Sequence, residues 1–496
     1  MTMRRKDQMP KQFRAAIAVL TLLAAAATLS AQNAADERVR RIENGLLPPV
    51  LIKGQPLRTL KLDERMRELN VPGVSVAVFE NGRIEWTRGW GVADVATGRR
   101  VDAETRFQAA SISKPVAAVA ALALVSRGQL SLDKDINTYL TSWKLPDNEF
   151  TARQKVTLTH LLSHTGGVTV SGFRGYAGGE GVPTLLQLLE GTKPANSAPV
   201  RVDIPVGTRW RYAGGGYAIA QLAIEDVTKK PFADVLRELV LEPAGMSHST
   251  FAQPLPADLR DKAASGYRTG GDPVPGGWHT YPELAAAGLW TTPADLARFA
   301  IALQQAAAGT SKRPLLPREM ATRMLRPVMD DYGLGVGSTG SGSDAQFTHS
   351  GGNAGFRCLL VAFKDIASGV VVMTNGDRGT TIAPEIVRAV AREYRWAGLS
   401  PVERTQGTSD PAVYKDFAGR YEIPTRSPPV VLVIETDGGR LYRGTGPMRA
   451  ELLPETPTTF FATDGDLRIE FLRDASGKVT EARVWQGSIE RRAVRR

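Results

Sequence analysis

The stretch FQAASISKPVAAVAALALVSRG, residues 107–128, joins a reactive pair of side chains to an apolar segment of helical length. Ser111 and Lys114 are three residues apart, so on a helix they share a face and can touch. Serine is a weak nucleophile without an adjacent base, and an uncharged lysine amine can serve as that base. Burial disfavours the ammonium form, and the apolar run that follows Lys114 predicts a helix start sunk into the interior. The stretch therefore predicts a nucleophilic serine beside a buried lysine.

A second S-x-x-K occurs in SLDK, at Ser131 and Lys134. It lies beside Asp133 and Asp135, and these charges favour a surface helix with Ser131 as its capping residue. The spacing alone is a weak signal, so other motifs must decide between the two serines.

The flanking segments predict one antiparallel sheet built from both ends of the domain. GVSVAVFENGRIEWTRGWGVAD (73–94) alternates around Asn81-Gly82, which is typical of a hairpin, and FRCLLVAFKDIASGVVVMTN (356–375) predicts a second one. Residues 60–69 and 384–398 predict helices, and helices with Gly/Pro-rich loops fill 111–330. The pattern predicts an α+β domain, with a central antiparallel sheet flanked by helices and an inserted helical subdomain.

The two ends of the chain differ from this middle part. A basic segment (1–14) and an apolar one (15–29) precede a small-residue cleavage site after Ala31, so residues 1–31 predict a secretory signal peptide. The mature protein would be secreted or periplasmic, with no stable membrane anchor. We expect the α+β domain over 32–400, a linker over 401–411 and a small all-β domain over 412–496, the last with a supporting or substrate-gating role.

Composition excludes several classes of protein. The chain has 496 residues, 42% hydrophobic and 23% charged, and its net charge of +11 is scattered rather than gathered in an aromatic-interleaved stripe, so we expect no nucleic-acid partner. Cys358 is the single cysteine, in a strand-like segment, and we expect it to be buried. His160 and His164 are four apart but lack a third ligand, which favours a structural role at a helix end over a metal site. No cofactor motif is present.

Two later motifs follow the S-x-x-K at Ser111. RWRYAGGGYAIAQLAIEDV (209–227) places Tyr212 in a glycine-rich loop before a helix, and THSGGNAGF (348–356) places His349-Ser350-Gly351 before the second hairpin. In this order the three motifs resemble those of the serine β-lactamase and penicillin-binding protein superfamily. The class C β-lactamase-like serine hydrolases are the most similar branch, which includes esterases, D-aminopeptidases and DD-carboxypeptidases. The resemblance spans about residues 60–398. It includes the segments LTHLLSHTGGV (158–168), LEPAGMSHSTF (241–251) and AAGLWTTPADLARF (286–299).

The resemblance implies a β-lactamase/transpeptidase-like fold and a role for each motif residue. Ser111 would be the acylated nucleophile, Lys114 its proton acceptor and Tyr212 a proton shuttle to the leaving group. The backbone N–H groups of Ser111 and Gly352 would form the oxyanion hole. His349, Ser350 and Gly351 would line the substrate site together with Gly352, and the reaction would need no cofactor or metal.

Two departures from the family pattern bear on the substrate. Gly214 stands where the Tyr-x-Asn motif has an asparagine that commonly touches the lysine and a substrate amide carbonyl. His349 stands where Lys-Thr-Gly has a lysine, and an unperturbed histidine is largely neutral at pH 7. Both favour ester or small-amide substrates over β-lactams. Carboxylesterase, D-amino-acid peptidase and β-lactamase activities are the candidate reactions. The alternative is a catalytically weak protein of the same fold that binds cell-wall fragments or a partner.

Overall fold

The computed structural model describes residues 34–424, 430–446, 449–487 and 489–496. The predicted signal peptide, residues 1–31, lies outside these residues. Residues 34–43 are helical. Among the described helices, none is both long and apolar enough to span a bilayer.

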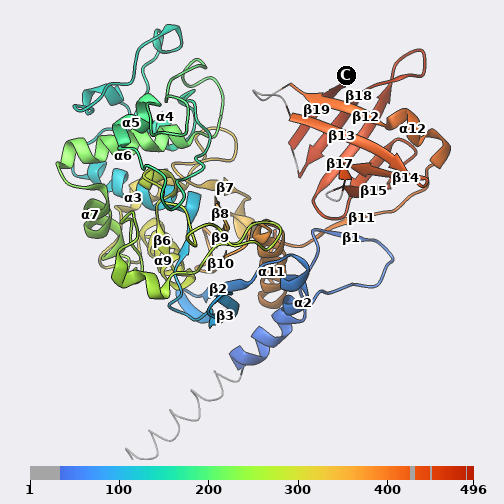
Figure 1. Cartoon of the computed structure of the whole chain (residues 1–496), viewed down its shortest axis with the longest axis horizontal. Helices are drawn as coiled ribbons and strands as arrows, with labels where there is room; N and C mark the ends of the chain where they lie inside the picture. The colour runs from blue at the N-terminus through green and yellow to red at the C-terminus, as the bar shows by residue number, and fades with distance from the viewer. Residues whose placement is uncertain (1–33, 425–429, 447–448, 488) are drawn as a thin grey trace, which may run out of the picture.

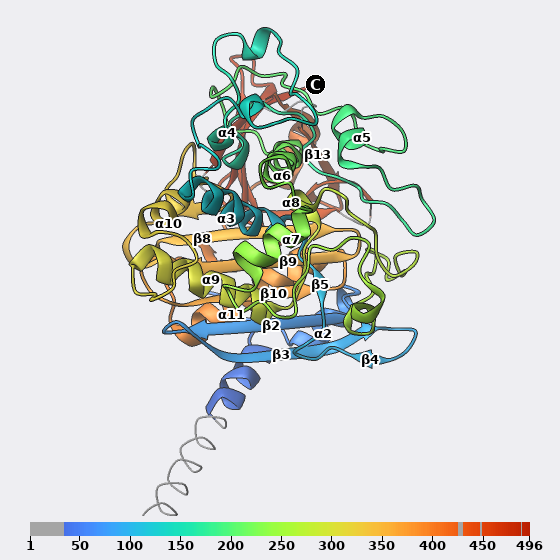
Figure 2. The same cartoon turned by 90° about the vertical axis from the view of Figure 1, so that its left-hand side faces the viewer.

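An antiparallel sheet forms the centre of the first domain, and its strands run across the view in Figure 2 in the order β4-β3-β2-β10-β9-β8-β7. The strands are β2 (Gly73–Glu80), β3 (Arg83–Asp94), β4 (Arg99–Arg100), β7 (Gly337–Thr339), β8 (Gln346–Asn353), β9 (Phe356–Phe363) and β10 (Gly369–Thr374). Both predicted hairpins are confirmed, β2 with β3 and β9 with β10. Strand β2 pairs with β10, so the sheet combines strands from both ends of the domain, as expected.

Helices cover both faces of this sheet, because alternate side chains of each strand point to opposite sides. Ala77 and Phe79 of β2 join the core beneath α3 (Ser113–Ser126) and α9 (Pro293–Ala308). Val76 and Val78 join a second core beneath α2 (Leu62–Glu68) and α11 (Gly379–Tyr394). Figure 1 shows α9 and α11 on opposite sides of the strands. The predicted helices at 60–69 and 384–398 correspond to α2 and to the later part of α11.

The helical subdomain lies in the middle of the chain, where the sequence predicts it. Its remaining helices are α4 (Leu158–Leu162), α5 (Leu185–Glu190), α6 (Gly214–Thr228), α7 (Phe232–Leu236), α8 (Leu284–Ala287) and α10 (Arg318–Leu325). Shorter elements connect them: β5 (Phe107–Gln108), β6 (Trp290–Thr291), and the helical turns η1 (Ala110–Ile112), η2 (Ile136–Thr138), η3 (Glu149–Thr151), η4 (Arg237–Leu241) and η5 (Ala257–Lys262).

The C-terminal segment forms a separate all-β domain, a closed antiparallel barrel. Its strands are β12 (Gly419–Ile423), β13 (Val430–Asp437), β14 (Arg440–Arg443), β15 (Ala450–Pro454), β16 (Thr459–Ala462), β17 (Leu467–Arg473), β18 (Val479–Gln486) and β19 (Ile489–Arg495). The short alternating segments predict an all-β module, and the structure has one. The pairing of the first strand, β12, with the last, β19, closes these strands into a barrel. Apolar side chains fill the interior of the barrel. The Phe417 ring of α12 (Tyr414–Phe417) stacks on the Phe471 ring, with 4.6 Å between the ring centroids.

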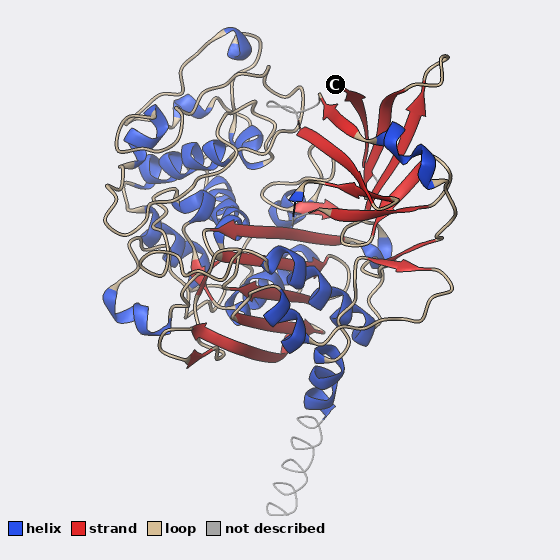
Figure 3. Cartoon of the chain, turned by 45° about the vertical axis from the view of Figure 1, so that its right-hand side comes forward, coloured by secondary structure: helices blue, strands red, loops and turns tan. Residues whose placement is uncertain are grey.

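The barrel lies beside the sheet-and-helix domain (Figure 3). Strand β1 (Val50–Ile52), near the beginning of the chain, pairs in parallel with β11 (Val402–Arg404) in the predicted linker. Arg404 then forms an ion pair of 2.8 Å with Asp466 of the barrel. The junction between the two domains is thus fixed by the pairing of β1 with β11 and by the ion pair of Arg404 with the barrel.

The predicted capping role of Ser131 is wrong. No helix begins there: the next helical turn is η2, and the side chain of Asp135 accepts from the backbone N–H of Asn137 at its start. The Ser131 hydroxyl instead accepts from Asp133 N at 3.3 Å. Aspartate is as good an N-cap as serine, so the later residue takes the role.

Candidate active site

Ser111 and Lys114 lie in contact at the junction of η1 and α3. Lys114 Nζ is 3.1 Å from Ser111 Oγ and donates to the carbonyl of Ala286, in α8, at 2.8 Å. The Lys114 side chain is buried, because α3 is apolar on every face and is enclosed by the core over nearly its whole length. Ala110, next to the serine, has a φ of +50°, a left-handed conformation that costs an L-residue about 1–2 kcal/mol. The packing of η1 against β8 holds this strained turn.

Tyr212 closes over the same lysine from a distant part of the chain. Lys114 Nζ lies 4.9 Å from the centroid of the Tyr212 ring and 5.6 Å from that of Tyr217, in α6. The structure therefore brings together Ser111, Lys114 and Tyr212, although Tyr212 follows Lys114 by 98 positions in the sequence.

Strand β8 carries the third motif along the edge of the site. A Cβ built on Gly351 would lie 2.1 Å from the carbonyl oxygen of Ala109, so only glycine lets β8 approach η1 this closely. Asn353 of β8 pairs with Phe356 of β9 across a two-residue turn, and this pair exchanges hydrogen bonds. Hydrogen-bonded and non-hydrogen-bonded pairs alternate along an antiparallel ladder, so the next pair, Gly352 with Arg357, exchanges none. The N–H of Gly352 therefore points away from β9.

His349 is buried and does not present a positive charge to the site. Its Nδ1 donates to the carbonyl of Ser350 at 2.7 Å, and its Nε2 accepts from the Tyr332 hydroxyl at 3.2 Å. Burial, reinforced by the charge of Lys114, lowers the pKa of His349 to about 3. Both ring nitrogens are occupied, and the ring is neutral at physiological pH.

The ring of His164 makes a contact that the sequence did not predict. It lies directly after the C-cap of α4, at the helix end where the sequence predicts it, with a left-handed φ of +62°. Its ring also packs against Tyr212 with 4.3 Å between centroids, and its Nδ1 accepts from Ala213 N at 3.1 Å. Burial, followed by the charge of Lys114, lowers the pKa of His164 well below its ordinary value. A neutral histidine thus supports Tyr212. Its place in the segment LTHLLSHTGGV was the available signal. His160 does have a local role, in a capping box with Thr157.

Three consecutive glycines allow a loop to lie directly on the start of α6. Gly214 N donates to Ser171 O at 3.2 Å, and Gly215 N donates to Val170 O at 3.0 Å. A Cβ on Gly214 would lie 2.9 Å from the Phe173 ring. The space that an asparagine side chain would enter is therefore filled by an aromatic ring.

Glu283 lies on the segment that leads into α8. It is fully buried, and among the described residues neither carboxyl oxygen has a hydrogen-bond partner. Burial raises the pKa of Glu283 to about 8, so the carboxyl is largely protonated at neutral pH. Gln221 of α6 fixes the same segment by bonding Pro282 O and Ala285 N. Glu283 thus sits beside the segment whose Ala286 carbonyl receives Lys114.

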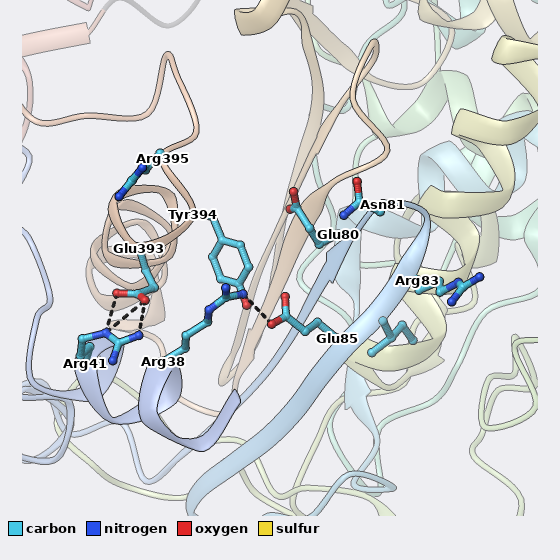
Figure 4. A pocket seen from close by; sticks show the side chains of 10 residues that line it. Arg38, Arg41, Glu80, Asn81, Arg83, Glu85, Glu393, Tyr394 and Arg395 are labelled. Atoms are coloured by element: carbon cyan, nitrogen blue, oxygen red, sulfur yellow. Dashed lines mark hydrogen bonds and ion pairs between the residues drawn. The ribbon is translucent and has the colours of Figure 1, made fainter. Parts of the chain in front are cut away.

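Other potential sites carry less chemistry. Within the described ranges, no three His, Cys, Asp or Glu side chains gather closely enough to hold a metal. Cys358 is buried, as predicted, and donates to Gln108 O. A surface cavity of about 960 Å³ lies on the α11 side of the sheet (Figure 4), where Arg38 pairs with Glu85. Its lining is Arg38, Arg41, Glu80, Asn81, Arg83, Ile84, Glu85, Glu393, Tyr394 and Arg395, without a nucleophile.

Comparison with known proteins places this geometry in context. The family model described as Beta-lactamase matches residues 60–394. Penicillin-binding protein 4 of Amycolatopsis lactamdurans is 28% identical over 73% of this chain and 96% of its own length. Esterase EstB of Burkholderia gladioli is 30% identical over 39% of this chain and half of its own. The solved structure of the octameric penicillin-binding protein homologue from Pyrococcus abyssi superposes with a TM-score of 0.60 at 21% identity. That superposition covers 87% of this chain and 98% of the other.

Proposed function

Because the chain belongs to the beta-lactamase family, we propose that it is a serine hydrolase that cleaves esters through an acyl-enzyme on Ser111. The observation that carries the proposal is the 3.1 Å contact between Lys114 Nζ and Ser111 Oγ in a buried setting. An uncharged lysine amine is the form that can accept the serine proton. Family relatives named as an esterase and a penicillin-binding protein agree with acyl transfer as the reaction class.

Each motif residue has a defined step in the proposed reaction. Lys114 accepts the proton of Ser111 as Oγ attacks the carbonyl carbon of the substrate. The N–H groups of Ser111 and Gly352 stabilise the oxygen that becomes negative. When the tetrahedral intermediate collapses, the proton held by Lys114 passes through the Tyr212 hydroxyl to the departing alcohol. The acyl group remains on Ser111 as an ester. Water then attacks that ester and gives a proton to the same lysine. The bond from the acyl carbon to Ser111 Oγ breaks, Oγ takes that proton back from Lys114, and the acid leaves.

The environment of the site favours esters over β-lactams and peptides. A neutral, fully bonded His349 gives a substrate carboxylate no cation to meet. Gly214 offers no side-chain amide to a substrate carbonyl. Esters need neither contact, and their alcohol leaving group departs more easily than an amine. Small amides are the second substrate class.

Covalent labelling tests this proposal. The protein is incubated with a fluorophosphonate and, separately, with benzylpenicillin, and its intact mass is read for the unmodified protein, Ser111→Ala and Ser131→Ala. Ser131 is the matched control because it begins the second S-x-x-K. We expect a fluorophosphonate adduct that disappears only in Ser111→Ala, and little or no penicillin adduct. An adduct that survives Ser111→Ala would refute the assigned nucleophile, and the absence of any adduct would favour the binding protein.

Turnover then ranks the substrates. A panel of p-nitrophenyl butyrate, a chromogenic cephalosporin and a D-Ala-D-Ala peptide covers the three candidate reactions. We expect turnover of the ester, lowered at least about 1,000-fold by Lys114→Ala. Faster hydrolysis of the cephalosporin or the peptide than of the ester would contradict the ester assignment.

Export is a separate part of the proposal. The basic and apolar segments of residues 1–29 support removal of a leader after Ala31. Expression of the full chain in a Gram-negative host, fractionation and N-terminal sequencing test it. A mature protein beginning at Gln32 in the periplasm is the expected result, and an uncleaved chain in the cytoplasm would refute it.

A further inference from the structure

The loop over residues 168–173 is anchored before it reaches the start of α6. Val168 bridges to Val202, and Thr169 N donates to Arg201 O at 2.8 Å. Val170 adopts a left-handed φ of +62°, which turns the chain towards the helix. The carbonyls of Val170 and Ser171 then receive the first N–H groups of α6. The loop is therefore held at a fixed place, together with the aromatic side chain that follows.

Phe173 occupies the space in front of Gly214. Its Cε2 and Cδ2 atoms would lie 2.9 and 3.3 Å from a Cβ at that position. The ring is half-buried, with one part packed on the domain core and another part open. An aromatic ring offers no N–H to a carbonyl oxygen, but it does favour apolar contact.

This ring lies beside the segment that carries Tyr212. Two peptide units separate Gly214 from Tyr212, so their Cα atoms are at most about 7.6 Å apart. The Tyr212 ring in turn lies 4.9 Å from Lys114 Nζ. A substrate bonded to Ser111 that extends past Tyr212 towards the start of α6 would meet the Phe173 ring there.

We propose that Phe173 determines the acyl specificity of the site, as an apolar wall that selects esters of aliphatic or aromatic acids. The inference rests on the proposed ester hydrolysis and names its substrate class: an acyl chain of a few carbons without an amide. Each methylene that the wall removes from water raises kcat/KM by up to about fourfold.

A chain-length series tests the wall. The p-nitrophenyl esters from acetate to hexanoate are assayed with the unmodified protein, Phe173→Ala and Phe173→Leu. We expect kcat/KM of the unmodified protein to rise with acyl chain length. In Phe173→Ala the ratio of kcat/KM for the hexanoate ester to that for the acetate ester should be at least fivefold smaller. Phe173→Leu should retain most of the rise. The acetate ester, which is too short to use the wall, should change less than about threefold.

A control separates this role from a structural one. Phe150 on η3 is also a half-buried ring packed on the same core, so Phe150→Ala removes a similar volume from outside the loop. It should leave the chain-length profile unchanged. An equal loss for all esters in Phe173→Ala would overturn the inference and assign Phe173 a packing role only. If the unmodified protein turns over no ester and Ser111 takes no fluorophosphonate, the proposed function itself fails.

Discussion

The buried carboxyl of Glu283 makes the stability of the first domain depend on pH. Its pKa lies at about 8 in the folded protein against an ordinary value of 4.5. Between these values the unfolded chain releases the proton and the folded chain keeps it, so the free energy of unfolding falls as pH rises from 4.5 to about 8. Across this pH range the free energy of unfolding falls by about 5 kcal/mol in all, at about 1.4 kcal/mol per pH unit.

The substitution Glu283→Gln preserves the shape of the side chain and removes the proton. Urea unfolding at intervals between pH 5 and 8, followed by tryptophan fluorescence, gives the free energy of unfolding at each pH. All tryptophans except Trp485 precede the barrel, so the signal reports mainly on the first domain. In Glu283→Gln we expect the fall of the free energy of unfolding with pH to become less steep, by up to about 1.4 kcal/mol per pH unit, which corresponds to one proton. The exposed control Glu149→Gln should follow the unmodified protein. Parallel curves for Glu283→Gln and the unmodified protein would refute the reasoning.

Three further predictions follow from close packing and burial. Gly214→Ala should lower Tm because its Cβ would meet the Phe173 ring at 2.9 Å, and Phe173→Ala should relieve most of that loss; strictly additive losses would contradict the steric argument. Gly351→Ala should abolish ester turnover and lower Tm strongly, since its Cβ would lie 2.1 Å from the backbone oxygen of Ala109; a fully active, stable variant, measured by turnover and calorimetry, would show that β8 can move away. Because the pKa of His349 is lowered to about 3, the unfolded chain binds a proton first on acidification, so stability should fall from pH 6.5 towards 3, and His349→Gln should reduce that fall in the same urea assay; an unchanged slope would contradict the buried, neutral ring.

Local patterns predict the sheet and the contact between Ser111 and Lys114 well. The Asn81-Gly82 turn and the alternation around it specify a hairpin from neighbouring residues alone, and the structure forms it. Ser111 and Lys114 are three residues apart, so a single helical turn suffices to bring them together. Tyr212 was found by the order of motifs, which substitutes for a contact that its own neighbours do not encode.

The residues that sequence reasoning missed act through contacts between distant segments. His164 reads locally as the end of a helix, and only the return of the chain at Arg211–Ala213 places its ring against Tyr212. Phe173 belongs to a loop without regular structure, and nothing in its neighbours predicts that α6 will begin beneath it. Glu283 would be an ordinary exposed carboxyl in most settings, and packing against α6 and the neighbouring loops buries it.

The sequence by itself determined the order of the elements, the two-domain plan and the paired serine and lysine, because each depends on periodicity or spacing within a few turns of the chain. Only the tertiary structure decided that the C-terminal strands close into a barrel, that His349 is neutral and fully bonded, and that an aromatic ring replaces the missing asparagine. These depend on which surfaces meet after folding, since burial and close approach are properties of assembled segments rather than of any one of them.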